Sequence, residues 1–188
     1  MSKREEIIQK GAMIIHRKGY HNTGIKEILD EVKIPKGSFY FYFKSKQDFG
    51  LAVIEFFSKH VTSEFERITQ SSLSPLDGLQ RFFTEFLEFF HQSEYQGGCP
   101  LGNMALELAD DEEIFRQALL DSFNSLTTRI QEKIASSNQS TDDNTGELAQ
   151  FILFSWEGCI MQMKLQRSNE PIKTFNKIIF SNLLNSTL

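Results

Sequence analysis

Residues 19–28 read GYHNTGIKEI, and residues 34–46 read IPKGSFYFYFKSK. In the first stretch Gly19 is a typical C-terminal stop for one helix, and Thr23 is a candidate side-chain cap for the next. The second stretch predicts a short helix over 36–43, in which Phe39 and Phe43 share one face and are expected in the core. Helices of about sixteen, eight and seven residues with a tight second turn are typical of a helix-turn-helix.

Outward from this unit, the sequence predicts only helices. The 188 residues include only 11 glycines and four prolines. Because these helix breakers are few, long stretches of the chain are uninterrupted, and this favours helices over a sheet with many turns. Apolar residues keep helical spacing to the C-terminus, so we expect an all-α fold of about nine helices. An N-terminal helix-turn-helix domain over 1–46 would precede a larger helical domain over 47–188. The polar stretch 136–146 predicts a flexible loop between helices.

The distribution of charged residues changes at the same boundary, between residues 46 and 47. Residues 1–46 hold ten Lys and Arg against five Asp and Glu, whereas residues 47–188 hold ten against twenty. We call residues 1–46 the head and residues 47–188 the body. A basic head on an acidic body favours a polyanion as the partner of the head alone. Chance clustering of surface charge is the alternative.

Other classes of protein fit less well. No apolar stretch reaches the roughly 18 residues of a membrane span, so no membrane partner is expected. The N-terminus lacks the hydrophobic region of a secretory signal. Cys99 and Cys159 are expected as free thiols of a cytoplasmic protein. The cysteines and the four histidines are scattered without ligand spacing, so neither a metal nor a cofactor is expected.

The third predicted helix carries the chemistry of a nucleic-acid contact, because a helix-turn-helix places this helix in the major groove. This helix and the residues directly after it carry five side chains that could donate hydrogen bonds to phosphates or base edges: Lys36, Tyr40, Tyr42, Lys44 and Lys46. Gly37 would let backbone and DNA approach closely, and Thr23 would present its hydroxyl and backbone N–H to a phosphate. The alternative is a small helical bundle whose aromatic residues are all core.

Both quoted stretches closely resemble the TetR family of regulators. The family pattern there is approximately G-Y-x-x-T-S/T-I/V-x-D/E-I, followed by V-S-K-G-x-L/F-Y-x-H/Y-F-x-S/T-K. The resemblance implies two groups of DNA-binding residues. One group would hold the DNA backbone, and it comprises Thr23, Lys36, Tyr40 and Lys46. The other group would face base edges, and it comprises Ser38, Phe39 and Tyr42.

Three residues depart from that pattern. Lys33 stands where the family often has glycine, and a left-handed lysine would cost roughly 1 kcal/mol there. Pro35 replaces a common serine, so the third helix loses a side-chain cap. With Phe41 followed by Tyr42, the third helix lacks the histidine that is usual there, which changes one polar contact. These departures bear on base preference and not on the fold.

The body offers two candidate sensing features. The phenylalanine stripe over 82–90 is either ordinary core or the wall of an apolar effector pocket. Residues 97–110 resemble the G-C-x-x-x-N-x-x-x-E-x-A/S segment of a TetR branch that includes repressors responding to reactive electrophiles. A cysteine just ahead of a helix can be a stabilised thiolate, so Cys99 is a candidate sensor; the alternative is a small residue filling a corner. The predicted effector set comprises Cys99, Phe86, Phe90, Met104, Phe123 and Trp156.

The last two predicted helices, about 147–166 and 171–184, have the pattern of an interface. The first of them is apolar on more than one face and so needs more than one partner. Residues 155–168 resemble the same branch, whose last two helices pair with their copies in a homodimer. The implied interface residues are Phe151, Phe154, Ser155, Gly158, Gln162, Phe175 and Ile179. Core of a monomer is the alternative.

The sequence therefore predicts a homodimeric transcriptional regulator that binds a palindromic double-stranded DNA operator. A small apolar or electrophilic effector would release it, and repression is the usual direction in the family, with activation left open. An enzyme using Cys99 as nucleophile lacks a convincing base and orienting partner. A scaffolding helical protein is the remaining alternative.

Overall fold

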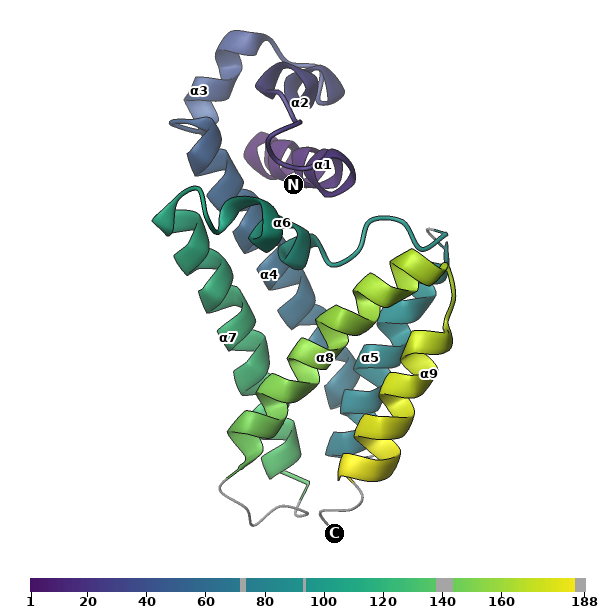
Figure 1. Cartoon of the computed structure of the whole chain (residues 1–188). Helices are drawn as coiled ribbons and strands as arrows, with labels where there is room; N and C mark the ends of the chain where they lie inside the picture. Colours follow the sequence, from purple (N-terminus) through teal and green to yellow (C-terminus); the bar gives the residue numbers. More distant parts are fainter. Residues whose placement is uncertain (72–73, 93, 138–143, 185–188) are drawn as a thin grey trace. The chain divides into compact units, whose positions relative to one another are not determined.

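The computed structural model describes residues 1–71, 74–92, 94–137 and 144–184, without the side chains of Lys36 and of 86–92. Over these residues it has nine α-helices and no strand, which confirms the predicted all-α fold (Figure 1). The helices are α1 Lys3–Lys18, α2 Ile25–Glu31, α3 Phe39–Tyr42, α4 Lys46–Gln70, α5 Pro75–Gln92, α6 Pro100–Leu108, α7 Glu113–Ala135, α8 Thr145–Gln166 and α9 Glu170–Asn176. A 3-10 turn, Lys36–Ser38, precedes α3, and a π-helix, Lys177–Leu183, follows α9. None of the described helices is both long and apolar enough to cross a membrane.

In the turn between α1 and α2, one prediction is confirmed and one is wrong. Helix α1 ends at Gly19, which has a φ of 87° and donates its N–H to the Ile15 carbonyl at 2.7 Å. Thr23 does not cap α2: the N-cap is Gly24, without a side-chain hydrogen bond. The Thr23 hydroxyl donates instead to the Gly19 carbonyl at 2.7 Å. Thr23 therefore closes the turn after α1 and does not start the next helix.

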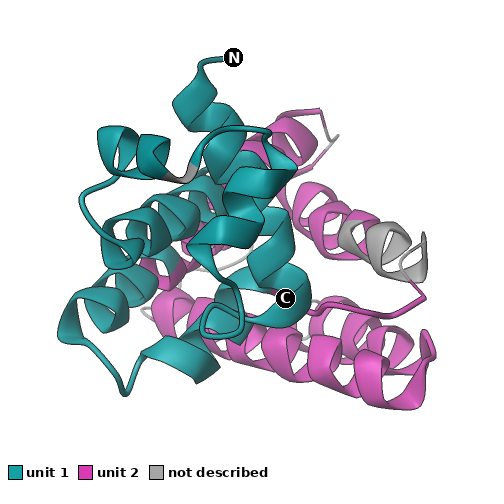
Figure 2. Cartoon of the chain, turned by 90° about the horizontal axis from the view of Figure 1, so that it is seen from above, with its two compact units in different colours: residues 1–61, 100–122 teal, residues 62–99, 123–188 magenta. Residues whose placement is uncertain are grey.

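The chain forms two compact units (Figure 2). The first comprises residues 1–61 and 100–122, and the second comprises 62–99 and 123–188. The first unit thus adds the beginning of α4, all of α6 and the beginning of α7 to the three N-terminal helices. The domain boundary predicted at residue 46 is a functional one, between a DNA-binding part and a sensing part of the chain. It stays a prediction.

The core of the first unit is aromatic where α3 meets α4. Phe39 and Phe43 are buried with ring centroids 5.3 Å apart, and Phe49 lies 5.1 Å from Phe43, so the prediction that Phe39 and Phe43 are core is confirmed. Gly50 of α4 allows another close approach. A Cβ atom there would lie 2.7 Å from the Tyr20 ring and 3.0 Å from Phe115.

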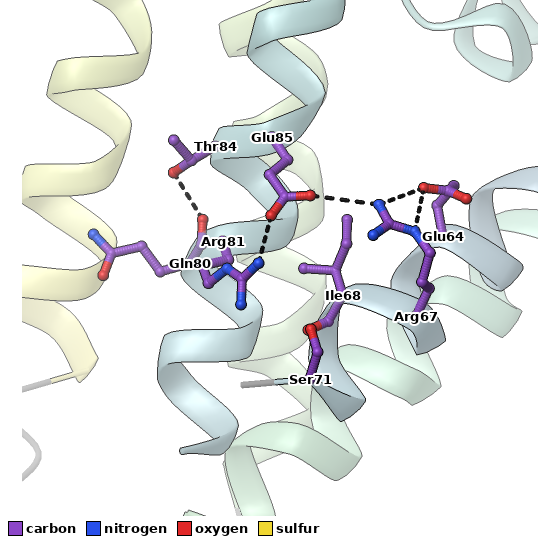
Figure 3. Close-up of polar contacts among 8 residues, drawn as sticks. All are labelled: Glu64, Arg67, Ile68, Ser71, Gln80, Arg81, Thr84 and Glu85. Atoms are coloured by element: carbon purple, nitrogen blue, oxygen red, sulfur yellow. Dashed lines mark hydrogen bonds and ion pairs between the residues drawn. The ribbon is translucent and has the colours of Figure 1, made fainter. Parts of the chain in front are cut away.

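The core of the second unit surrounds Phe83 of α5. Its ring centroid lies 5.0 Å from Trp156, 5.3 Å from Phe175 and 6.3 Å from Phe180. On the surface of this unit, an ion pair joins α4 and α5 (Figure 3): the Arg67 guanidinium of α4 donates to Glu85 of α5 at 3.4 Å, and within α4 it also donates to Glu64 at 2.7 Å. Exposed pairs of this kind contribute little to stability, whereas the buried rings of Phe65 in α4 and Phe82 in α5 pack edge to face with centroids 4.9 Å apart.

Candidate DNA-binding and sensing sites

Helix α3 has one buried face and one exposed face. Phe39 lies on the buried face, whereas Tyr40 is 65% exposed and Phe41 is 85% exposed. Tyr42 and Ser38 are half-buried. Gly37 is exposed, and a Cβ atom there would meet nothing within 4 Å, so no contact inside the protein requires glycine at this position. The arrangement presents small, hydroxyl and aromatic groups outward on the helix that a helix-turn-helix places in the major groove.

Other residues predicted for DNA contact are used inside the first unit. Thr23 and Phe39 are completely buried, so neither has exposed surface for a phosphate or a base. The Lys46 ammonium donates to the Tyr20 carbonyl at 2.7 Å and lies 4.4 Å from the centroid of the Tyr20 ring. Burial lowers the pKa of Lys46. The side chain of Lys36 lies outside the described residues. The DNA-binding roles of all four stay predictions.

The turn between α2 and α3 forces a lysine into a left-handed conformation. Lys33 has a φ of 55°. Its N–H donates to the Asp30 carbonyl at 3.2 Å, and the N–H of Ile34 donates to the Leu29 carbonyl at 3.1 Å. These two bonds are the Schellman pattern, whose left-handed position is usually glycine. The expected departure from the family pattern is thus a real conformational cost in this chain.

The basic character of the head is partly neutralised by internal ion pairs. Lys10 pairs with Glu31 at 3.3 Å, and Lys18 pairs with Glu27 at 2.7 Å. Within the part of the chain that the structure describes, three exposed lysines between the start of α2 and the start of α4 have no ion-pair partner: Lys26, Lys33 and Lys44. Their charges are available to an external polyanion.

Glu107 of α6 binds the turn that follows α1. Its two carboxylate oxygens accept the backbone N–H of Tyr20 at 2.8 Å and that of His21 at 2.7 Å. Beside this clamp, the His21 imidazole contacts the Asp111 carboxylate at 2.7 Å. Burial and the nearby Glu112 and Glu107 raise the pKa of the Tyr20 phenol to about 12. The quoted family pattern contains the glutamate, but sequence spacing gave no sign that it holds the head's backbone.

Cys99 is the last residue of the first of the two segments that form the second unit, and two glycines precede it. Gly97 and Gly98 have φ values of 92° and 94°, which side-chain-bearing residues rarely adopt. The Cys99 thiol hydrogen-bonds to the Glu157 carboxylate of α8; burial raises the pKa of Glu157, and this hydrogen bond opposes the rise. Cys159 is buried, and burial raises the pKa of its thiol to about 11. The two thiols therefore have different environments.

The other residues of the predicted effector set are divided between the two units. Met104 is buried in α6 of the first unit, whereas Trp156 is in the aromatic core of the second. Phe123 is half-buried in α7. The side chains of Phe86 and Phe90 lie outside the described residues. Glu157 is the additional polar group that sequence reasoning missed, because a single glutamate in a mixed helix has no distinguishing pattern. Within the described part of the chain, no three His, Cys, Asp or Glu side chains gather to hold a metal ion.

Helices α8 and α9 are neighbours in the second unit (Figure 1). Residues of both helices line a groove. Its volume is about 480 Å³, and six predicted interface residues line it: Phe151, Ser155, Gly158, Gln162, Phe175 and Ile179. Phe151 is 51% exposed, and the neighbouring Phe154 is 67% exposed. A Cβ atom at Gly158 would meet nothing within 4 Å. Phe175 and Ile179, by contrast, are mostly buried within the unit and offer little surface to a partner.

Comparisons with known proteins place the chain in a family. Residues 7–53 match the model of bacterial regulatory proteins of the tetR family, and residues 75–178 match the C-terminal domain of LmrA/YxaF-like transcriptional regulators. The chain is 31% identical to the HTH-type transcriptional repressor DhaR of Mycobacterium sp. (strain GP1), over 98% of this chain and 93% of that repressor. It is 32% identical to the transcriptional regulator AcuR of Cereibacter sphaeroides, over 92% and 81%.

Solved structures agree with this placement. The crystal structure of regulatory protein TetR from Rhodobacter sphaeroides superimposes with a TM-score of 0.84 at 30% identity, covering 93% of this chain and 95% of that one. The reduced form of NemR from E. coli shares the fold, with a TM-score of 0.83 at 22% identity and 96% coverage of both chains. The chain therefore belongs to the TetR family of bacterial regulatory proteins and is a DNA-binding transcriptional regulator, not an enzyme.

Proposed function

We propose that this regulator is a homodimeric repressor that binds a palindromic operator and leaves it when an effector reacts with, or binds beside, Cys99. The observation that carries the proposal is the clamp between Glu107 and the backbone of Tyr20 and His21. The names of relatives such as DhaR and NemR support repression as the direction of control.

The route from sensor to head is a single short helix. Cys99 directly precedes α6, which begins at Pro100 and reaches Glu107 near its C-terminal end. Nine helical residues span about 13 Å and move as a rigid rod. A displacement at the start of α6 is therefore transmitted to the turn after α1, because the Glu107 carboxylate holds two backbone amides of that turn.

An electrophile would act by breaking the contact that fixes Cys99. In the reaction with an α,β-unsaturated carbonyl compound, the sulfur forms a bond to the β-carbon, and the thiol proton ends on the α-carbon, so no atom is lost. The adduct removes the hydrogen bond from the thiol to Glu157. The conformation released in this way must bind DNA less well, since an effector shifts an equilibrium only through its preference between two states.

The experiment uses a duplex that the protein itself selects from a random-sequence library, with N-ethylmaleimide as the electrophile. We expect the unmodified protein to bind the duplex and the alkylated protein to release it. Cys99→Ser should bind and stay bound after treatment, whereas Cys159→Ser, the matched control, should respond as the parent does. Release of Cys99→Ser by the reagent would refute the sensing role, and a failure to select any sequence would refute the operator.

Dimerisation through α8 and α9 is the second part of the proposal. It is supported by the groove, by exposed Phe151 and Phe154, and by the open space at Gly158. Each dimer would bury two copies of Phe154, and burying one such side chain is worth about 1.5–3 kcal/mol. Phe154→Glu should therefore raise the dimer dissociation constant at least about a hundredfold.

Sedimentation velocity over a concentration series would measure that change. The control is Leu106→Glu, because Leu106 of α6 is 91% exposed and lies on no proposed interface. A dimer that persists in Phe154→Glu at the same concentrations as in the parent would exclude this face. Loss of the dimer in the Leu106→Glu control would show that added charge alone is responsible.

A further inference from the structure

Phe41 is an apolar side chain at the most outward position of helix α3. It is 85% exposed, and the next residue along the chain toward the N-terminus, Tyr40, is 65% exposed. Successive residues of an α-helix are rotated by about 100°, so Phe41 points roughly opposite to Phe39, which is completely buried. In a helix-turn-helix the face of the last helix opposite the core is the face that enters the major groove.

The phenyl ring is held in place by a neighbour. The rings of Phe41 and Tyr42 have centroids 5.0 Å apart and an interplanar angle of 87°, an edge-to-face contact. Tyr42 is itself half-buried. The exposed ring is thus supported from one side, and it presents a preorganised apolar surface to whatever approaches α3.

The chemistry of Phe41 limits what it can read on DNA. A phenyl ring has no donor or acceptor, so it contributes no hydrogen bond to phosphates or base edges. The exposed lysines Lys33 and Lys44 flank α3 in the sequence and suit the phosphates on either side of a groove. Among the groups that normal bases present in the major groove, the 5-methyl group of thymine is the apolar one.

We propose that Phe41 recognises a thymine by packing its ring against the 5-methyl group, and so sets base preference at one position of each half-site. The inference deepens the DNA-binding role of the family. It rests on the proposed dimer only for the number of contacts per operator.

The test replaces thymine by uracil, which differs only in lacking this methyl group. A duplex is selected by the full-length parent protein from a random-sequence library, and each thymine of the selected site is then replaced in turn by uracil in both half-sites. Affinity is measured by fluorescence anisotropy. Burying one methyl group is worth about fourfold in affinity, so one symmetric pair of replacements should weaken binding by about fifteenfold.

Variants of Phe41 decide whether this ring reads the methyl group. Phe41→Ala should bind the thymine and uracil duplexes equally at that position, and Phe41→Leu, which keeps an apolar side chain, should retain most of the discrimination. Because phosphate contacts strengthen as salt falls, each variant is compared at a salt concentration where it binds measurably. The parent and Phe41→Ala thus form a double-mutant cycle with the methyl group.

Three results would overturn the inference. The parent could bind every uracil duplex as well as the thymine duplex, Phe41→Ala could keep the parent's preference for thymine, or Phe41→Ala could lose all binding even at low salt. A failure to enrich any sequence at all would be a different result, since it would refute the proposed operator binding itself.

Discussion

Replacing Lys33 by glycine should stabilise the protein, because this residue has a φ of 55° in the turn that ends α2. An L-residue in the left-handed region costs about 1–2 kcal/mol through contact of its Cβ atom with the backbone. Glycine removes that contact but loses more conformational freedom on folding, which costs about 0.5–1 kcal/mol. The expected net gain is about 0.5–1 kcal/mol.

The gain should appear in two measurements. The midpoint of urea unfolding should rise without a change in its slope. For a chain of this length, 1 kcal/mol corresponds to about 2–4 °C in Tm, so Lys33→Gly should melt about 1–4 °C higher. The side chain is exposed and makes no ion pair among the described residues, so its removal has no folding cost.

Lys33→Ala is the control, since it removes the same charge and keeps the Cβ atom. It should leave Tm unchanged or lower it slightly. If alanine stabilises the protein as much as glycine does, the strain is not in the backbone, and the physical account of this turn is wrong. Both variants remove one exposed cation of the head, so any loss of DNA affinity should be equal in the two.

Four further predictions concern the first unit and the buried thiol. Gly50→Ala should cost about 1–3 kcal/mol in urea unfolding, because its Cβ atom would lie 2.7 Å from the Tyr20 ring, whereas Gly24→Ala, which meets nothing within 4 Å, should cost under about 1 kcal/mol. Glu107→Gln should cost about 1–3 kcal/mol, because a single amide oxygen replaces two carboxylate acceptors; unchanged denaturation curves would contradict the clamp. Cys159 has a pKa of about 11, so roughly one thiol in ten thousand is ionised at pH 7; its alkylation, followed by peptide mass spectrometry, should stay slow until the pH approaches 11. The raised pKa of Tyr20, about 12, means that the folded protein keeps a proton that the unfolded chain releases above about pH 10; stability should fall between pH 10 and 12, and Tyr20→Phe should show a smaller fall there.

Much of the fold followed from local chemistry that is visible in the sequence. Gly19 ends α1, where its backbone freedom places it. Lys33 was recognised as a left-handed candidate from its place in a turn. The wrong prediction at Thr23 has a local cause: its hydroxyl has two possible backbone partners, and it donates to the Gly19 carbonyl four residues earlier instead of capping α2. Local propensity does not decide between such partners.

The candidate sites were less accessible to sequence reasoning. Phe39 was predicted both as core and as a base contact, and only burial separates the two roles. Lys46 was predicted as a phosphate contact from its charge, but its ammonium is bonded to a carbonyl oxygen 26 residues earlier in the chain. Glu107 lies 87 residues from Tyr20. Contacts over such distances depend on how helices pack, and helical periodicity carries no information about them.

The Glu107 clamp acts on the main chain of residues 20 and 21, and this choice has a practical consequence. Every residue except proline supplies the same backbone amide proton. Substitution of the side chain at position 21 therefore leaves the hydrogen bond intact, whereas position 107 tolerates little change. The two amide protons are also built-in reporters. In the clamped protein they should exchange slowly with solvent, and their release into heavy water would time the movement of α6 without any label attached.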